Sequence, residues 1–135
     1  MAARLNRWFR VWAPAVLYLA LITGLSHIRF GRLSIRTFTY ADKVIHGFIY
    51  ALLCLLLFRI LRASRHRWFV RWAPLVALVL ASAYGVIDEW HQSFVGRDCD
   101  PADWLADTIG AALMAAALMV YVEIHDHPGD EREVY

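Results

Sequence analysis

Charged residues are scarce in this sequence, and long stretches of the chain contain none. Asp, Glu, Lys and Arg together make up 19% of the 135 residues, whereas hydrophobic residues make up 60%. A typical soluble domain has about 25% charged and about 45–50% apolar residues. The shortage of charge argues against a soluble globular protein. If the protein were soluble, it would have to be a bundle of very apolar helices.

Cysteine is also rare, and the common metal-binding motifs are missing. Cys54 falls inside an apolar segment and Cys99 in a polar one, so we expect neither a disulfide between them nor a cysteine metal site. The chain contains no HExxH pattern, the signature in which one helix supplies two zinc ligands.

What the sequence does contain is a set of four apolar segments. Residues 12–28, 44–58, 72–87 and 109–122 carry no Asp, Glu, Lys or Arg. A helix needs ~20 residues to cross the ~30 Å hydrocarbon layer. With polar end residues included, we predict an all-α fold, a polytopic membrane bundle of four transmembrane helices. We place the spans at 11–28, 41–61, 73–94 and 101–122, within a membrane domain of residues 1–122, followed by a weakly ordered acidic tail at 123–135.

The basic residues predict an orientation. The N-terminal segment, the segment 59–71 and the C-terminal tail share one side of a four-span protein and carry nine Arg, against five basic residues on the other side. Because Lys and Arg favour the cytoplasm, we predict that both termini are cytoplasmic.

Prolines and one aspartate mark the predicted helix starts. Pro14, Pro74 and Pro101 stand near the starts of the first, third and fourth spans. Proline is tolerated there because the N–H groups of a first helical turn have no hydrogen-bond partner within the helix. Asp100 precedes Pro101 and can cap the fourth helix, which puts Asp103 at its third position.

Polar residues gather at helix ends that the topology brings to one membrane face. The second span begins there, the third ends there and the fourth begins there. The residues are Asp42, His46, Asp88, Glu89, His91, Gln92, Asp100, Asp103 and Asp107, with His27 at the end of the first span. Placing an ionisable group inside the membrane costs free energy, so such residues usually mark a functional site.

Simpler explanations cover part of this set. Asp100 and Asp42 are explained by capping, Asp88 and Asp98 by solvation, and Lys43 by pairing with an acid. His27 can sit at the interface, and Arg97 can tie down a loop. The residues that these explanations leave are His46, Glu89, Gln92, Asp103 and Asp107, which we expect to point inward together.

Three strings carry a family resemblance. They are Asp42-Lys43-Val44-Ile45-His46 with Tyr50, then Gly85 to Gln92 with Phe94, Gly96 and Arg97, and then Asp103, Asp107 and Gly110. In order and spacing they resemble the three signatures of the VanZ-like family, over roughly residues 40–115. Asp107 stands where the family more often has Asn, and His91 is an extra imidazole.

This resemblance implies a bacterial membrane protein of the cell envelope. The family takes its name from a member associated with resistance to teicoplanin, and it supplies no agreed reaction. We therefore expect a multi-pass protein of the bacterial cytoplasmic (inner) membrane with its site on the extracytoplasmic side. Its expected partners are membrane lipids and a lipid-linked envelope precursor, with no nucleic acid.

The first functional hypothesis is a membrane-embedded acid–base enzyme acting on a lipid-linked glycan. Glu89 would be the general acid or base, with His46 or His91 as its partner. Arg97 and Lys43 would hold an anionic head group. The residues assigned to catalysis are Glu89, His46, Asp103, Asp107, Asp42 and His91, and those assigned to substrate binding are Arg97, Lys43, Gln92 and Tyr50.

Several alternatives stay open at this point. A divalent metal is one, because Asp42, His46 and Asp103, with Glu89 and His91, offer oxygen and nitrogen ligands. A second is a protein that binds or shields a lipid head group or an antibiotic without altering it. A third is a structural network between helices, although contacts of this kind average only ~0.6 kcal/mol in membranes. A proton-coupled transporter fits poorly, since the inner half of the predicted bundle lacks polar residues.

Overall fold

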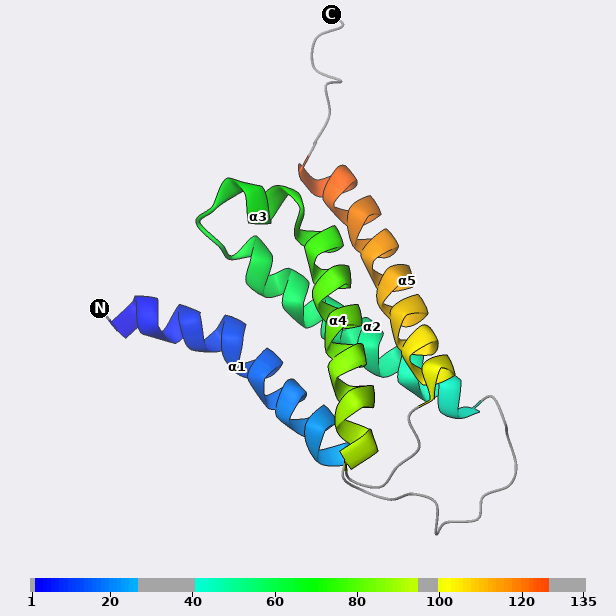
Figure 1. Cartoon of the computed structure of the whole chain (residues 1–135). Coiled ribbons are helices and arrows are strands. Elements are labelled where there is room, and N and C mark those ends of the chain that lie inside the picture. Colours follow the sequence, from blue (N-terminus) through cyan, green and yellow to red (C-terminus); the bar gives the residue numbers. More distant parts are fainter. Residues whose placement is uncertain (1, 27–40, 95–99, 127–135) are drawn as a thin grey trace, which may run out of the picture.

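The computed structural model describes residues 2–26, 41–94 and 100–126, and every described element is a helix. The order is α1 (Ala2–Ser26), α2 (Ala41–Arg62), α3 (Arg67–Arg71), α4 (Ala73–Phe94) and α5 (Pro101–Asp126), as Figure 1 shows. Four of these helices are long and apolar enough to cross a membrane. The predicted all-α fold with four membrane-spanning helices is therefore confirmed.

The helix boundaries agree closely with the predicted spans in the middle of the chain and less well at its two ends. The α4 helix has the predicted bounds, and α2 is one residue longer than predicted. The first apolar span, Phe9–Ser26, starts close to the predicted residue 11, but helix α1 begins at residue 2, so the expected position of Pro14 in a first helical turn is wrong. Helix α5 continues to Asp126, so the first four residues of the predicted tail are helical, while residues 127–135 lie outside the described part. The short α3 was not expected.

The predicted cap of α5 is confirmed. The backbone N–H of Ala102 donates to Asp100 Oδ1 over 2.9 Å. The N–H of Asp103 donates to the Asp100 carbonyl, also over 2.9 Å. Two N–H groups of the first turn, which have no partner inside the helix, are thereby satisfied. This fixes where α5 starts and therefore the height of the acids in its first two turns.

Helix α2 lies at the centre of the bundle and contacts α1, α4 and α5. Small residues make these contacts close. Ala73, Ala77 and Ala81 form a fully buried strip on α4, and a Cβ added to Gly110 of α5 would run into the backbone carbonyl of Gly47 on α2. In membranes, where lipid is as apolar as leucine, such close approach of backbones drives helix association.

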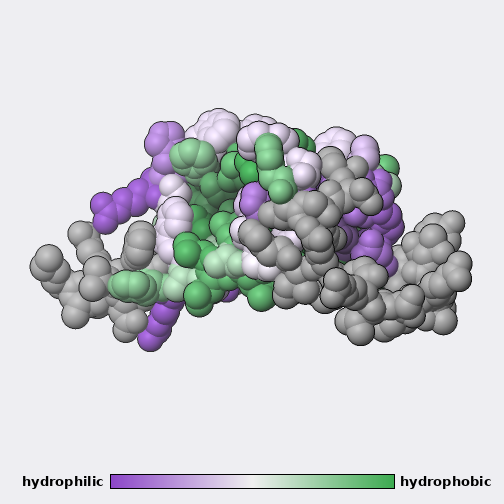
Figure 2. Space-filling view, turned by 60° about the horizontal axis from the view of Figure 1, so that its bottom comes forward, coloured by the Kyte–Doolittle hydropathy of each residue, from purple (hydrophilic) through white to green (hydrophobic). Residues whose placement is uncertain are grey.

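Large apolar side chains point outward along the bundle. Leu17, Phe48, Val79 and Leu113 are all more than half exposed. The space-filling view shows broad apolar surface, with hydrophilic residues in separate groups (Figure 2). This inverted pattern suits hydrocarbon rather than water as the surroundings, and it identifies a multi-pass membrane protein.

The ends of the four long helices meet as the topology requires. In Figure 1 the C-terminal ends of α1 and α4 lie beside the N-terminal ends of α2 and α5, whereas α3 lies at the opposite end. The buried polar residues belong to the first of these ends. They are Ser26, Asp88, Glu89, Gln92, Asp103 and Asp107.

Candidate functional site

An imidazole–carboxylate pair joins α2 to α5. His46 Nδ1 lies 3.0 Å from Asp107 Oδ1, and Asp107 is 1% exposed. An ionised carboxylate only accepts hydrogen bonds, so Nδ1 donates to ionised Asp107. In the neutral imidazole, the other ring nitrogen, Nε2, then keeps its lone pair.

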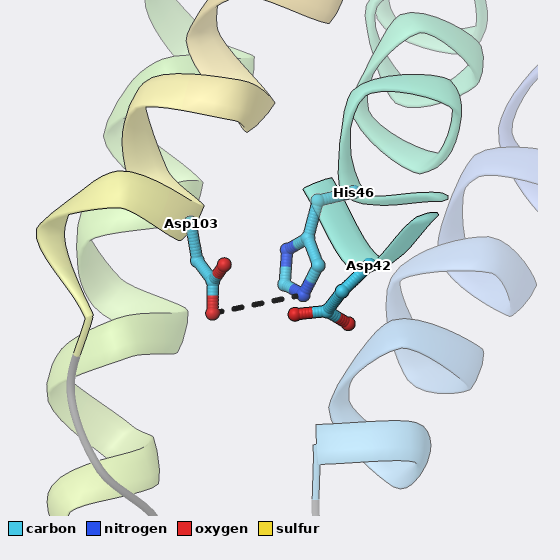
Figure 3. Close-up of side chains that lie close together, drawn as sticks. All are labelled: Asp42, His46 and Asp103. Atoms are coloured by element: carbon cyan, nitrogen blue, oxygen red, sulfur yellow. Dashed lines mark ion pairs between the residues drawn. The ribbon is translucent and has the colours of Figure 1, made fainter. Parts of the chain in front are cut away.

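Nε2 faces two further carboxylates. It lies 4.0 Å from Asp103 Oδ2, which is too long for a hydrogen bond. Figure 3 shows the imidazole between Asp103 of α5 and Asp42 of α2. One ligand atom from each of Asp42, His46 and Asp103 can be chosen so that all three lie within 4.8 Å of one another.

Lys43 is paired with acids on α5. Its Nζ lies 2.7 Å from Asp100 Oδ2, and it also pairs with Asp103 Oδ1. The hydrogen bond from Lys43 is the main reason that the pKa of the Asp100 carboxyl is lowered from its ordinary value, and the bond from the Ala102 N–H adds to it. Lys43 thus acts as a counter-ion, and its ammonium is already engaged.

A second polar network joins α1 to α4. Ser26 Oγ donates toward the two oxygens of Asp88, at 2.7 and 2.9 Å. Gln92 Nε2 donates to Asp88 Oδ2 over 3.0 Å. This network encloses Asp88, which is 7% exposed and forms no ion pair with Lys or Arg within the described ranges.

Glu89 has both oxygens engaged by protein groups. Its Oε2 accepts the backbone N–H of Asp100 at 3.0 Å, and its Oε1 accepts Gln92 Nε2 at 3.4 Å. The first of these bonds joins the last turn of α4 to the residue that caps α5. Glu89 therefore holds the two helix ends together.

A cavity of about 360 Å³ opens among α1, α2 and α4. Its apolar walls come from Ile22, Leu25, Ile45 and Ile49, and its polar residues are Ser26, Asp42, His46, Tyr50, Asp88 and Gln92. Two buried polar atoms of this lining, the hydroxyl of Tyr50 and Oε1 of Gln92, have no hydrogen-bond partner among the described residues. Tyr50 is 2% exposed and Gln92 is 1% exposed, so bulk water does not reach them freely.

The predicted site residues are thus divided between three places. Asp42, His46, Asp103 and Asp107 lie together with Lys43 between α2 and α5, and Tyr50 and Gln92 line the cavity with Asp42 and His46. Glu89 lies at the junction of α4 and α5, and His91 is partly buried on α4. Arg97, His27 and Asp98 lie outside the described residues. The roles assigned to all of them stay predictions.

Ser26 was missed by the sequence interpretation, although its side chain holds Asp88. A serine in the last turn of an apolar helix commonly bonds only to a backbone carbonyl of its own helix, and Ser26 does bond to the carbonyl of Ile22. The sequence has no pattern that distinguishes such a serine from one that also binds a neighbouring helix. Only the packing of α1 against α4 identifies its partner.

These features define the class: a polytopic α-helical membrane protein with a buried, carboxylate-rich polar site at one end of the bundle. The chain belongs to the VanZ/LLP1 family, whose sequence model matches residues 3–122. The predicted family resemblance is confirmed, and the match extends it from residues 40–115 to nearly the whole chain. Neither the comparison with curated proteins nor the comparison with solved structures gave a match.

Proposed function

We propose that the cavity among α1, α2 and α4 binds the polar head group of a membrane-anchored envelope molecule, of which a lipid-linked glycan is the chemical type. One observation carries this proposal. The hydroxyl of Tyr50 and the carbonyl oxygen of Gln92 belong to residues that line the cavity, and both atoms are buried without a partner within the described residues. Leaving a buried polar group unsatisfied costs about 1–3 kcal/mol, which a bound ligand would recover.

The lining favours a ligand rich in hydrogen-bond donors. Gln92 Oε1 and the carboxylates of Asp42 and Asp88 accept hydrogen bonds, and no lysine or arginine is among the lining residues that the structure describes. Sugar hydroxyls or an ammonium group suit such a site. An anionic group held by Lys43, which the sequence suggested, suits it less, because Lys43 is paired with two acids and does not line the cavity.

The apolar walls favour a ligand that arrives from the bilayer. Ile45 is more than half exposed on the surface of α2, while its neighbour His46 is largely buried. The cavity thus has hydrocarbon-facing residues beside polar ones, and an amphiphile can place its chain along the first and its head group among the second.

Binding is better supported than acid–base catalysis by Glu89. Both oxygens of Glu89 accept hydrogen bonds from the protein, so we assign it a positioning role at the α4–α5 junction. In the envelope, a protein that retains a wall precursor would also reduce the access of glycopeptides such as teicoplanin without any chemical step.

Tyr50→Phe tests the binding proposal. Because the Tyr50 hydroxyl has no partner among the described residues, its removal should not lower thermal stability, but the amount of amphiphile bound to the purified protein should fall to a small fraction of the wild-type amount. Mass spectrometry of lipids extracted from the purified protein measures this loss and identifies the ligand.

Tyr84→Phe is the matched control. The Tyr84 hydroxyl lies 2.7 Å from Thr23 Oγ1, so its removal should lower stability by about 0.6 kcal/mol, the average for such membrane contacts, and leave the ligand in place. Equal amphiphile retention by wild type, Tyr50→Phe and Tyr84→Phe would refute the proposal.

We further propose that the site faces the extracytoplasmic side of the bacterial inner membrane, with both termini in the cytoplasm. The excess of Arg on the N-terminal side supports this orientation. Cys54 is fully buried and provides no background, so a membrane-impermeant thiol reagent added to spheroplasts should label Cys99 alone. Labelling only after the cytoplasmic side is opened would reverse the orientation.

A further inference from the structure

We propose that Asp42, His46 and Asp103 bind a divalent cation of the Mn²⁺ or Zn²⁺ type beside the head-group cavity. The proposal stands on the geometry of the three side chains, on the carboxylate behind the imidazole and on the charges around them. It does not depend on which molecule occupies the cavity.

The three side chains come from two helices and converge on one point. Asp42 and His46 are one turn apart on α2, and Asp103 is in the first turn of α5 (Figure 3). Their ligand atoms lie within 4.8 Å of one another, with 4.0 Å between His46 Nε2 and Asp103 Oδ2. Metal–ligand bonds of about 2.0–2.2 Å separate neighbouring ligands of a tetrahedral cation by about 3.5 Å, so small side-chain rotations would bring these atoms onto one cation.

Asp107 prepares His46 for a metal. Metal-binding histidines almost always donate the second ring N–H to a carboxylate or carbonyl, which fixes the ring and its tautomer. His46 does so through Nδ1 to Asp107, at 3.0 Å. The lone pair of Nε2 then points to the space shared with Asp42 and Asp103.

The local charges leave room for one more cation. Lys43 pairs with Asp100 and with Oδ1 of Asp103, and the remaining oxygen of Asp103 faces His46. Neither Asp42 nor Asp107 forms an ion pair with Lys or Arg in the part of the chain that the structure describes. Lys43 opposes a second cation nearby, but its charge is already matched by two carboxylates. Of Asp42 and Asp107, only Asp107 is buried, and a buried carboxylate without a Lys or Arg partner is costly, a cost that a nearby divalent cation would offset.

The ligand types select the cation. Two carboxylates favour Mg²⁺ or Mn²⁺, whereas imidazole favours Zn²⁺ and other later metals, so the mixed set suits Mn²⁺ or Zn²⁺. Three protein ligands leave coordination positions open, as at catalytic rather than structural sites. Asp42 and His46 also line the cavity, so these positions face its ligand. That last step rests on the proposed head-group function, and the metal site itself does not.

The test uses full-length protein in detergent, stripped with EDTA. It is titrated with MnCl₂ while free Mn²⁺ is followed by electron paramagnetic resonance, and with ZnCl₂ in a parallel thermal-shift titration. Wild type should bind one cation per chain. Each of three variants should weaken cation binding at least about tenfold: Asp42→Asn, His46→Ala and Asp103→Asn. Loss of a residue that only supports a metal ligand already weakens affinity by about 10–100-fold, so loss of a ligand should cost no less.

Asp88→Asn is the matched control, because it removes the same charge from the same cavity at a position outside the three ligands. It should leave the dissociation constant nearly unchanged. Asp42 is exposed, so Asn at this position is expected to fold, and it keeps the test decisive if His46→Ala does not. No saturable binding of either metal by wild type, or equal weakening by Asp42→Asn and Asp88→Asn, overturns the proposal. Tyr50→Phe should bind Mn²⁺ normally, which separates this proposal from the head-group function.

Discussion

Gly110→Ala should destabilise the bundle severely, because the added methyl group meets backbone rather than a movable side chain. A Cβ at Gly110 would overlap the carbonyl, C and Cα atoms of Gly47 on α2. Overpacking of a core typically costs about 1–3 kcal/mol when side chains can shift, and here α2 and α5 must separate. We expect a large fall in the melting temperature in detergent, measured by tryptophan fluorescence or by static light scattering.

Gly47→Ala is the matched control at the same crossing. Its Cβ would lie 3.5 Å from the carbonyl oxygen of Ala106 and 3.9 Å from Gly110 Cα, which are ordinary contacts. The variant should therefore melt close to wild type. Gly24→Ala, whose Cβ would meet nothing within 4 Å, controls for the change in helix propensity. Melting of Gly110→Ala within a few degrees of Gly47→Ala would contradict the close crossing.

The Gly47–Gly110 crossing also sets the geometry of the polar site. His46 immediately precedes Gly47 on α2, and Asp107 lies about one turn before Gly110 on α5. If alanine at position 110 forces the helices apart, the 3.0 Å contact between His46 and Asp107 lengthens with them. A small residue in the apolar part of the bundle thus determines a distance in its polar part.

The sequence predicted the elements and the end of the bundle at which polar groups meet. Gaps in charge located the four spans, and the pair Asp100–Pro101 located the start of α5. The antiparallel order of the spans then brought Asp42, Glu89 and Asp103 to one end without any knowledge of packing. These predictions needed only hydropathy and capping chemistry, which act locally along the chain.

The sequence could not predict which polar groups face each other. The helices are apolar on nearly all sides, so periodicity leaves their rotation about their own axes undetermined. That rotation decides that His46 contacts Asp107, that Glu89 accepts the N–H of Asp100, and that Tyr50 lines a cavity. The residue type and depth of Glu89 suggest an acid or base, and that role stays a prediction, since both of its oxygens accept hydrogen bonds from other protein groups.

Asp107→Ala should have the largest effect on cation binding of any residue that does not contact the cation. The variant removes the acceptor that holds the His46 ring, so Nε2 loses both its orientation and its fixed tautomer. Changes of this kind weaken metal affinity by about 10–100-fold. The lost interhelical hydrogen bond should lower stability by only about 0.6 kcal/mol, with an upper value of about 1.7 kcal/mol. Mn²⁺ titration and melting without metal measure the two effects separately.

Asp107→Asn separates positioning from simple packing. The amide oxygen of Asn can still accept the hydrogen on Nδ1. We therefore expect the Asn variant to bind Mn²⁺ more tightly than the Ala variant and less tightly than wild type, because the negative charge behind the imidazole is gone. A purely structural role predicts a fall in melting temperature with unchanged Mn²⁺ affinity in the folded fraction. That outcome would remove Asp107 from the site and leave its contact with His46 as a link between α2 and α5.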